Sequence, residues 1–378
     1  MIKIHSQPVR LRLVLLMLLL LCLLNACGDA YALPSDLGGP IDSPTIHNQV
    51  YTPAQEARGT FQEFALPQKQ SGLMRPAIDA QGHVWFGEMS RNYLGAFDPQ
   101  SKDFWQGTPP GGKSGIMGIV VAPDDTIWFA EQYADYIGHF SPRSGQFHVY
   151  PLPTLTVPDP NNPGQTVSLP SAPNDIALDQ HGTLWFTELN ANAIGSLNTA
   201  SGTIRQYPLT SDKKAKALNP YGITVDPQGI VWFSEASTNR LGRLDPVGGQ
   251  ISYFTPPGTT SPLMELASDA RGHIWATTFV AGLLLQFDPA SSHFTIYSAP
   301  GANNGSGSLY GLLIASNGDV WVAITAENML ARFDVQGQRF FSYTIPTPDS
   351  LPMGLVEDQH HAIWFTEAGS DKIGMLQP

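Results

Sequence analysis

The chain has 378 residues, 42% of them hydrophobic, and a formal charge of −12. An acidic protein is a poor partner for DNA, RNA or anionic lipid headgroups, which attract basic surfaces. Its two cysteines, Cys22 and Cys27, lie close together near the start, so no disulfide is expected across the domain. A chain of this length can bury an ample core without one.

The first segment has the form of an export signal. Lys3, Arg10 and Arg12 precede an apolar run over 13–24, which is shorter than the roughly 20 residues that span a bilayer. The run ends at Leu24-Asn25-Ala26-Cys27, which resembles the lipobox of bacterial lipoproteins, although Asn25 is not the usual small residue. A plain secretory signal with an incidental cysteine is the alternative.

We therefore predict a signal peptide over 1–26, an acylated Cys27, and a tether rich in Pro and Gly over 27–58. The protein would be exported and held by lipid at the outer face of the cytoplasmic membrane, or at the outer membrane of a diderm host. Removing residues 1–26 takes the formal charge to −15, so the lipid and not the protein surface would provide the contact with the membrane.

From residue 59 onward one unit recurs seven times. The clearest copy, residues 220–254, has four short β-rich runs separated by Gly, Pro, Asn or Asp, a pattern typical of a four-stranded meander. Residues 59–378 are therefore predicted to form an all-β, seven-bladed β-propeller with four antiparallel strands per blade. The repeats align on seven tryptophans: Trp85, Trp128, Trp185, Trp232, Trp275, Trp321 and Trp364.

The two ends of the repeat array complement each other. The seventh copy stops at Ile373-Gly-Met-Leu376, after its third strand, and residues 61–66 are similar to the fourth strands of the other copies. We expect Phe61–Leu66 to pair with Lys372–Leu376 and to complete the last blade, which removes an open sheet edge.

Two sets of positions are predicted to share one face of the propeller. Three residues after the tryptophan, five repeats carry Glu, followed four residues later by Asn or Asp. A residue repeated in every blade usually has a structural task in each, here a turn or an inter-blade hydrogen bond, but a carboxylate site for Mg²⁺ or Ca²⁺, with Glu188 and Glu367 as ligands, is the alternative. Eleven residues before the tryptophan lies what we call the rim position: Met74, Met117, Asn174, Tyr221, Met264, Tyr310 and Met353.

The residue after the rim position breaks the repeat. It is Gly in four copies but Arg75, Asp175 and Glu265 in the other three, a pattern without an evident packing reason. Surface variation is the alternative to a ligand site at the mouth of the central channel, near the inserted loops 154–172, 213–216 and 301–307. The candidate catalytic residues are Glu265, Asp175 and Tyr310, and the candidate ligand-binding residues are Arg75, Asn174, Tyr221, Met264 and Met353.

The repeat resembles that of the virginiamycin B lyase (streptogramin B lyase) family, most clearly at 221–242 and 363–374, and the resemblance covers about residues 60–376. It implies eliminative opening of a cyclic depsipeptide ester with Mg²⁺. The family's sixth-blade His falls on Tyr310, its seventh-blade Glu-x-His on Leu351-Pro352-Met353, and a metal-binding Glu on Glu367. Both His are therefore absent, and elimination needs a base and an acid.

Three functions remain open at this point. The propeller binds a small molecule, glycan or peptide without chemistry, or it is a lyase with a relocated base such as Asp175 or Glu265. The third is a metal-dependent hydrolase, because Pro173-Asn174-Asp175 resembles a segment of gluconolactonase-like propellers. In each case we expect a monomer that touches the membrane only through its lipid and binds no nucleic acid.

Overall fold

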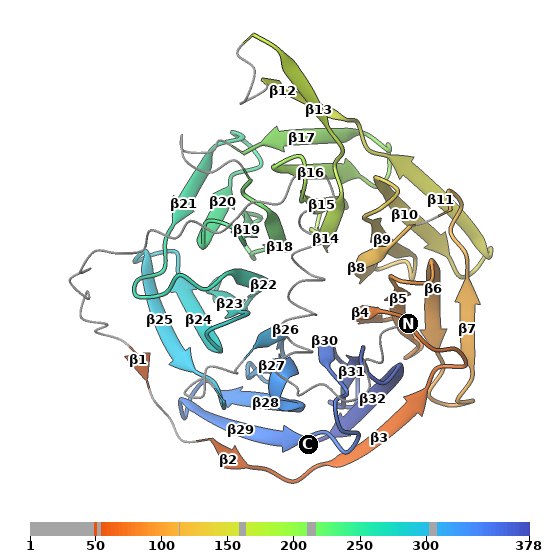
Figure 1. Cartoon of the computed structure of the whole chain (residues 1–378), viewed down its shortest axis with the longest axis vertical. Helices are drawn as coiled ribbons and strands as arrows, with labels where there is room; N and C mark the ends of the chain where they lie inside the picture. Colours follow the sequence, from red (N-terminus) through yellow and green to blue (C-terminus); the bar gives the residue numbers. More distant parts are fainter. Residues whose placement is uncertain (1–48, 51–53, 113, 159–163, 210–216, 302–307) are drawn as a thin grey trace, which may run out of the picture. The chain divides into compact units, whose positions relative to one another are not determined.

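Seven blades, each with four antiparallel strands, surround a central axis (Figure 1). The computed structural model describes residues 49–50, 54–112, 114–158, 164–209, 217–301 and 308–378, and the sheets belong to one compact unit, Asn48–Pro378. The predicted seven-bladed propeller is confirmed. Its one described helical turn is η2 (Thr325–Glu327), and no described helix has the length and hydropathy needed to cross a bilayer.

The strands follow one another from the axis outward in each blade. Blade one holds β4 (Leu73–Ile78), β5 (Val84–Glu88), β6 (Tyr93–Phe97) and β7 (Phe104–Gly107), and blade two holds β8 (Ile116–Val121), β9 (Ile127–Glu131), β10 (Tyr136–Ser141) and β11 (Gln146–Pro151). Blade three holds β14 (Pro173–Leu178), β15 (Thr183–Glu188), β16 (Ala193–Asn198) and β17 (Ile204–Pro208), and blade four holds β18 (Pro220–Val225), β19 (Val231–Glu235), β20 (Arg240–Leu244) and β21 (Ile251–Phe254).

The remaining blades repeat this order. Blade five holds β22 (Leu263–Ser268), β23 (Ile274–Thr278), β24 (Leu283–Asp288) and β25 (His293–Ser298), and blade six holds β26 (Leu309–Ile314), β27 (Val320–Ile324), β28 (Met329–Asp334) and β29 (Arg339–Thr344). Blade seven takes β30 (Pro352–Glu357), β31 (Ile363–Glu367) and β32 (Lys372–Gln377) from the end of the chain, and its outer strand is β3 (Thr60–Ala65).

The closure of the ring follows the prediction. β3 pairs antiparallel with β32, from Thr60 opposite Gln377 to Ala65 opposite Lys372. The Phe64 ring lies 4.5 Å from that of Phe97 in blade one, so the closing strand also packs against the next blade.

Two short strands precede β3 and lie within the segment predicted as tether. β1 (Gln49–Val50) pairs in parallel with β25, and β2 (Gln55–Glu56) pairs in parallel with β29. The chain thus runs along the outer edges of blades five and six before it closes blade seven (Figure 1). The inserted loop 154–172 forms a hairpin of β12 (Leu155–Pro158) and β13 (Thr166–Leu169), whereas residues 213–216 and 302–307 lie outside the described residues.

A pairing between the second and third strands explains why a Phe and a Gly recur at fixed positions of the repeat. In five blades a Phe of the second strand lies opposite a Gly of the third, as Phe186 does opposite Gly195. A Cβ on Gly195 would overlap with the Phe186 ring, so the glycine makes room for a buried aromatic side chain. Blades five and six exchange both partners together and hold Ala276 with Leu285 and Val322 with Ala331.

In five blades the tryptophan fixes the turn between the first and second strands through an Asp of that turn. In blade four the indole N–H of Trp232 donates to Asp226 at 2.8 Å, and the other oxygen of Asp226 accepts the backbone N–H groups of Gln228 and Ile230. The Trp232 ring then packs 5.6 Å from Phe287 of blade five. The hydrophobic core therefore lies between neighbouring blades, where each buried tryptophan joins two sheets.

Candidate functional site

A bulge in each innermost strand shapes the central channel. In β4 the pairing with β5 is regular at Leu73 and again at Pro76, so Met74 and Arg75 together oppose one residue. The same shift recurs in all seven blades and always falls on the rim position and the residue after it. Bulges of this kind redirect side chains, so the fold itself singles out these two positions.

The three residues that replace Gly after the rim position form one cluster. Arg75 of blade one donates from Nε to Glu265 Oε2 at 2.8 Å and from Nη2 to Glu265 Oε1 at 2.5 Å, the two-pronged geometry that suits a guanidinium and a carboxylate. Asp175 of blade three lies 3.3 Å from Arg75 Nε. All three are at most 9% exposed, so the cluster is an internal ion-pair network across the axis.

Asp175 and the rim tyrosines complete this cluster. Asp175 accepts the backbone N–H groups of Ile176 and Ile223, both at 3.0 Å. Tyr221 of blade four and Tyr310 of blade six share a hydrogen bond of 2.5 Å between their hydroxyl groups. The guanidinium carbon of Arg75 lies 5.6 Å from the centre of the Tyr221 ring and 5.9 Å from that of Tyr310, within reach of a cation–π contact.

Burial dominates the electrostatics of the cluster. It raises the pKa of Glu265 to about 7 and raises the pKa of Asp175, although Arg75 opposes both shifts. Burial lowers the pKa of Arg75, but the charges of Asp175 and Glu265, with smaller contributions from Tyr310 and Tyr221, together raise that pKa well above its usual value. Burial also raises the pKa of Tyr221 to about 12 and raises the pKa of Tyr310 well above its usual value.

Close contact between blades explains the glycines at the other four positions. A Cβ on Gly222 or Gly311 would overlap with the carbonyl oxygen of the next blade's rim residue, Met264 or Met353. A Cβ on Gly354 would lie 2.7 Å from Arg75 Cα. Gly is therefore required by sterics where it occurs, and the charged residues occupy positions from which they can meet at the axis.

The remaining candidate ligand-binding residues are buried and serve the channel wall. Asn174 donates to the carbonyl oxygen of Tyr221 at 3.0 Å and accepts from Gln132 at 3.2 Å, so its amide joins blades two, three and four. Met264 and Met353 are 3% and 4% exposed. The structure thus brings Arg75, Asp175, Glu265, Tyr221 and Tyr310 together and leaves Asn174, Met264 and Met353 as packing residues around them.

Sequence reasoning missed a set of hydroxyl groups that bridge the bulges of four blades to the next blade. Thr277 accepts the backbone N–H of Glu265 and donates to the carbonyl oxygen of Tyr310 in the next blade. Equivalent bridges from the second strand occur at Thr187, Ser234 and Thr366. The signal was present, since each of these residues is the one that follows the Phe or its counterpart in the second strand.

The ring of glutamates is fully buried, and four of its five members have local partners. Glu188 accepts from Gln206 at 2.7 Å, Glu235 forms an ion pair with Arg240 at 2.7 Å, and Glu367 accepts from Ser370 at 2.8 Å. Burial raises the pKa of both Glu188 and Glu367 to about 7. Among the described residues no group of three or more His, Cys, Asp or Glu side chains is placed so that it could hold a metal ion.

The Asn or Asp four residues after these glutamates forms both the turn and the inter-blade hydrogen bond that the sequence predicts. Asn192 has a left-handed backbone with φ of 49°, and its side chain accepts the backbone N–H of Leu218 in the next blade at 2.9 Å. Asp135 and Asp371 do the same toward Ala172 and Ser71, at 2.7 and 2.8 Å. The predicted turn and inter-blade hydrogen bond are confirmed, and these acids belong to the scaffold.

Comparison with known proteins agrees with this architecture. The sequence profile of the virginiamycin B lyase family matches residues 46–290. The chain belongs to that family. Curated protein sequences gave no match.

Solved structures extend the likeness to the whole ring. A streptogramin B lyase structure is 26% identical, with a TM-score of 0.73 over 84% of this chain and 97% of that one. A catalytically inactive variant of virginiamycin B lyase from Staphylococcus aureus, solved with quinupristin, is 25% identical, with a TM-score of 0.73 over 85% and 100%. The extracellular domain of BT4673 from B. thetaiotaomicron is 17% identical, with a TM-score of 0.61 over 83% and 39%, and shares the fold.

Proposed function

We propose that this member of the virginiamycin B lyase family is an exported, lipid-anchored propeller that binds a ligand over its channel and does not catalyse the family's elimination. One observation carries the proposal. Arg75 engages both oxygens of Glu265 and contacts Asp175, so the two acids that could act as a relocated base already neutralise an internal cation.

The tyrosines of the site are no better suited to proton transfer. An efficient base has a pKa near the working pH, and the pKa of Glu265 is about 7, but Arg75 binds both oxygens of that carboxyl. Burial raises the pKa of Tyr221 to about 12 and raises the pKa of Tyr310 well above its usual value. The hydroxyl groups of these tyrosines also bond to each other. Met353, which takes the place of a family His, carries no proton that it could exchange.

The relatives supply the class of ligand. The inactive S. aureus variant was solved with quinupristin, so in that protein loss of catalysis does not prevent binding. A cyclic depsipeptide of this type, or a peptide of similar size, is the ligand we propose for this chain. The inserted hairpin β12–β13 adds a surface found in one blade only, which fits a ligand preference of its own.

The test is to incubate the full-length protein in a nonionic detergent with quinupristin and Mg²⁺. We expect saturable binding by calorimetry and an unchanged ligand mass, because each lost acid–base group removes roughly 10²- to 10⁴-fold in rate. Linear product formed at a rate near that of the S. aureus lyase would overturn the proposal. Loss of that product in Asp175→Ala or Glu265→Ala would then identify the base.

The lipid anchor is part of the proposal and has its own test. Cys27→Ser should leave an unprocessed, unlipidated precursor and remove the mature species from the detergent phase in Triton X-114 partitioning. Unchanged partitioning would favour the alternative of a plain secretory signal.

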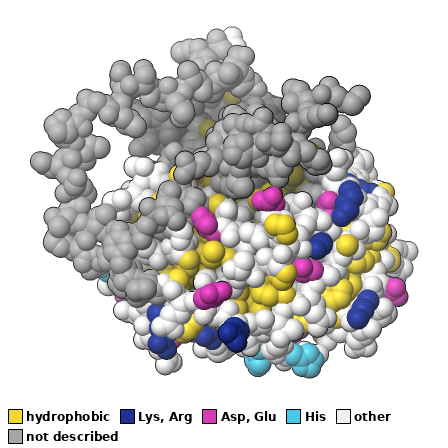
Figure 2. Space-filling model, turned by 60° about the horizontal axis from the view of Figure 1, so that its bottom comes forward, with side chains coloured by type: hydrophobic (Ala, Val, Ile, Leu, Met, Phe, Trp, Pro, Cys, Tyr) yellow, Lys and Arg dark blue, Asp and Glu magenta, His cyan; other side chains and the backbone are white. Residues whose placement is uncertain are grey.

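The distribution of charge on the surface supports the proposal that the protein binds no nucleic acid. On the face shown in Figure 2, Lys and Arg side chains lie singly or in small groups among acidic and hydrophobic ones. Nucleic-acid binding favours a continuous basic surface, and the chain carries 32 Asp and Glu against 20 Lys and Arg.

A further inference from the structure

A second break in the repeat lies on the wall between blades one and two. In six blades the outer strand carries an aromatic residue whose ring packs near the tryptophan of the second strand, for example Tyr207 beside Trp185 at 5.7 Å. By strand register the equivalent residue of blade one is Gly107. A Cβ on Gly107 would overlap with Trp105, because Trp105 lays its indole over the glycine and reaches Trp85 at 5.7 Å.

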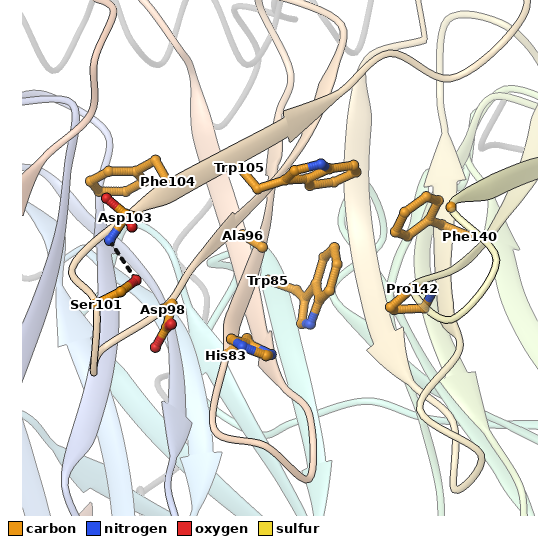
Figure 3. Close-up of a pocket in the computed structure, with 11 residues that line it drawn as sticks. His83, Trp85, Ala96, Asp98, Ser101, Asp103, Phe104, Trp105, Phe140 and Pro142 are labelled. Carbon is orange, nitrogen blue, oxygen red and sulfur yellow. Dashed lines mark hydrogen bonds between the residues drawn. The ribbon is translucent and has the colours of Figure 1, made fainter.

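A groove lies beside Trp105, in the blade where Gly107 replaces the aromatic residue of the other six. A cavity of about 440 Å³ opens between the outer half of blade one and the turn after β10, with Trp105, Trp85 and Phe140 on its aromatic side (Figure 3). Trp105 stacks on Phe140 with ring centres 4.9 Å apart, yet 41% of its surface remains exposed. The equivalent rings in the other blades are buried or half-buried, so only here among the described blades is the aromatic layer open.

The opposite side of the groove is acidic. Asp98 and Asp103 come from the turn between β6 and β7, and the residues that line the cavity include neither Lys nor Arg. The backbone N–H of Gln100 donates to Asp98 at 2.8 Å and lowers the pKa of that carboxyl, which keeps it charged. His83 turns its Nδ1 to Asp79 at 2.8 Å, so the ring is held in place beside the cavity.

We propose that this groove binds an organic cation, specifically an alkylammonium group. The face of an indole is the strongest aromatic partner for a cation, and two carboxylates beside it supply the opposite charge. An anion would be repelled by Asp98 and Asp103. The groove is built from the start of β5, the end of β6, the start of β7, and β10 with the turn after it, whereas the Arg75 cluster lies at the channel axis, so the two sites are separate.

The experiment is a titration of the full-length protein, in nonionic detergent, with choline, followed by tryptophan fluorescence and calorimetry. The matched ligand control is 3,3-dimethyl-1-butanol, which has the shape of choline without its charge. We expect saturable binding of choline and none of the neutral isostere. Binding of both to the same extent, or no saturation by about 50 mM choline, would overturn the proposal.

Variants locate the site. Trp105→Leu and Asp103→Asn should each weaken choline binding about 3- to 30-fold, the range expected for one cation–π or one charge contact. Asp103→Asn should leave the fold intact, since the hydrogen bond described for Asp103 comes from its backbone N–H, which donates to Ser101, and Asn keeps that group. Asp288→Asn, in the equivalent turn of blade five, should leave binding unchanged. Equal effects of Asp103→Asn and Asp288→Asn would contradict the assignment.

Discussion

At the scale of single residues, Arg75 is the cation on which two buried carboxyls depend. Arg75→Met should destabilise the protein by about 3–5 kcal/mol, because it leaves Glu265 and Asp175 buried without a counter-charge. Urea denaturation followed by tryptophan fluorescence measures this cost. The triple variant Arg75→Met, Asp175→Asn, Glu265→Gln removes the charges together and should recover most of the stability. Equal destabilisation in both variants would refute the ion-pair interpretation.

Glu131 makes a prediction about pH. Its side chain is fully buried, and neither carboxyl oxygen has a hydrogen-bond partner among the described residues, because Val149 occupies the register position held by Gln106 and Gln206 in blades one and three. Burial raises its pKa to about 8, above the value of 4.5 expected in the unfolded chain. The protonated form is therefore favoured by folding, and stability falls as the pH rises from about 4.5 through 8.

Glu131→Gln should flatten this decline. The measurement is the urea midpoint at several values between pH 5 and 9, compared with wild type and with Glu56→Gln, which changes an exposed glutamate. Glu188, Glu265 and Glu367 also have raised pKa values and keep part of the slope in every variant. An unchanged slope in Glu131→Gln would show that this carboxyl is already ionised in the folded protein.

The sequence was enough to identify the three charged residues of the channel, but not to predict that they contact one another. Arg75, Asp175 and Glu265 were visible because each replaces a Gly of the repeat. Their mutual bonds were not, since Arg75 and Glu265 are 190 residues apart and meet only after the ring closes. Because they recur in most blades, the Asn and Asp residues that follow the glutamates could be assigned a structural role, and the structure confirms their turn and inter-blade hydrogen bond. The repeat could not show that the charged residues had become an internal network.

At the scale of the element, the pairing of Phe and Gly across the second and third strands makes a specific prediction. Gly195→Ala should cost about 1–3 kcal/mol, because the added methyl group meets the ring of Phe186 in a packed interior. The double variant Phe186→Val, Gly195→Ala copies the Val322–Ala331 pair of blade six and should be more stable than the single one. Thermal unfolding by circular dichroism measures both. A double variant less stable than Gly195→Ala would refute the compensation.

Strands and their order were predictable because each repeat alternates apolar runs with turn residues. The bulges in the innermost strands were not predicted, because two residues that oppose one leave no distinct pattern in the sequence; in four blades a hydroxyl group of the second strand bridges the bulge to the next blade. The short strands β1 and β2 also escaped prediction, because two residues carry no periodicity and their pairing comes from the outer edges of blades five and six.

At the scale of the whole molecule, the ring depends on the pairing of β3 with β32. Deleting residues 59–68 should lower the melting temperature, because it exposes the edge of β32 and removes Phe61 and Phe64 from their contacts with Phe365 and Phe97. Deleting residues 30–39, a segment of equal length before the sheets, is the control. The closure would be refuted if the first variant melted at the wild-type temperature.

The pairing of β3 with β32 can form only at the end of synthesis. β3 is translated first among the strands of the blades and β32 last, and a ribosome adds about 5–20 residues per second, so β3 waits roughly 15–60 seconds for its partner. Throughout that interval the nascent chain carries an unpaired strand at one end and an unfinished blade at the other. A message truncated before the codons of Lys372–Gln377 would therefore yield a chain with six complete blades and two unpaired strand edges. We expect such a chain to be bound by chaperones and degraded by proteases.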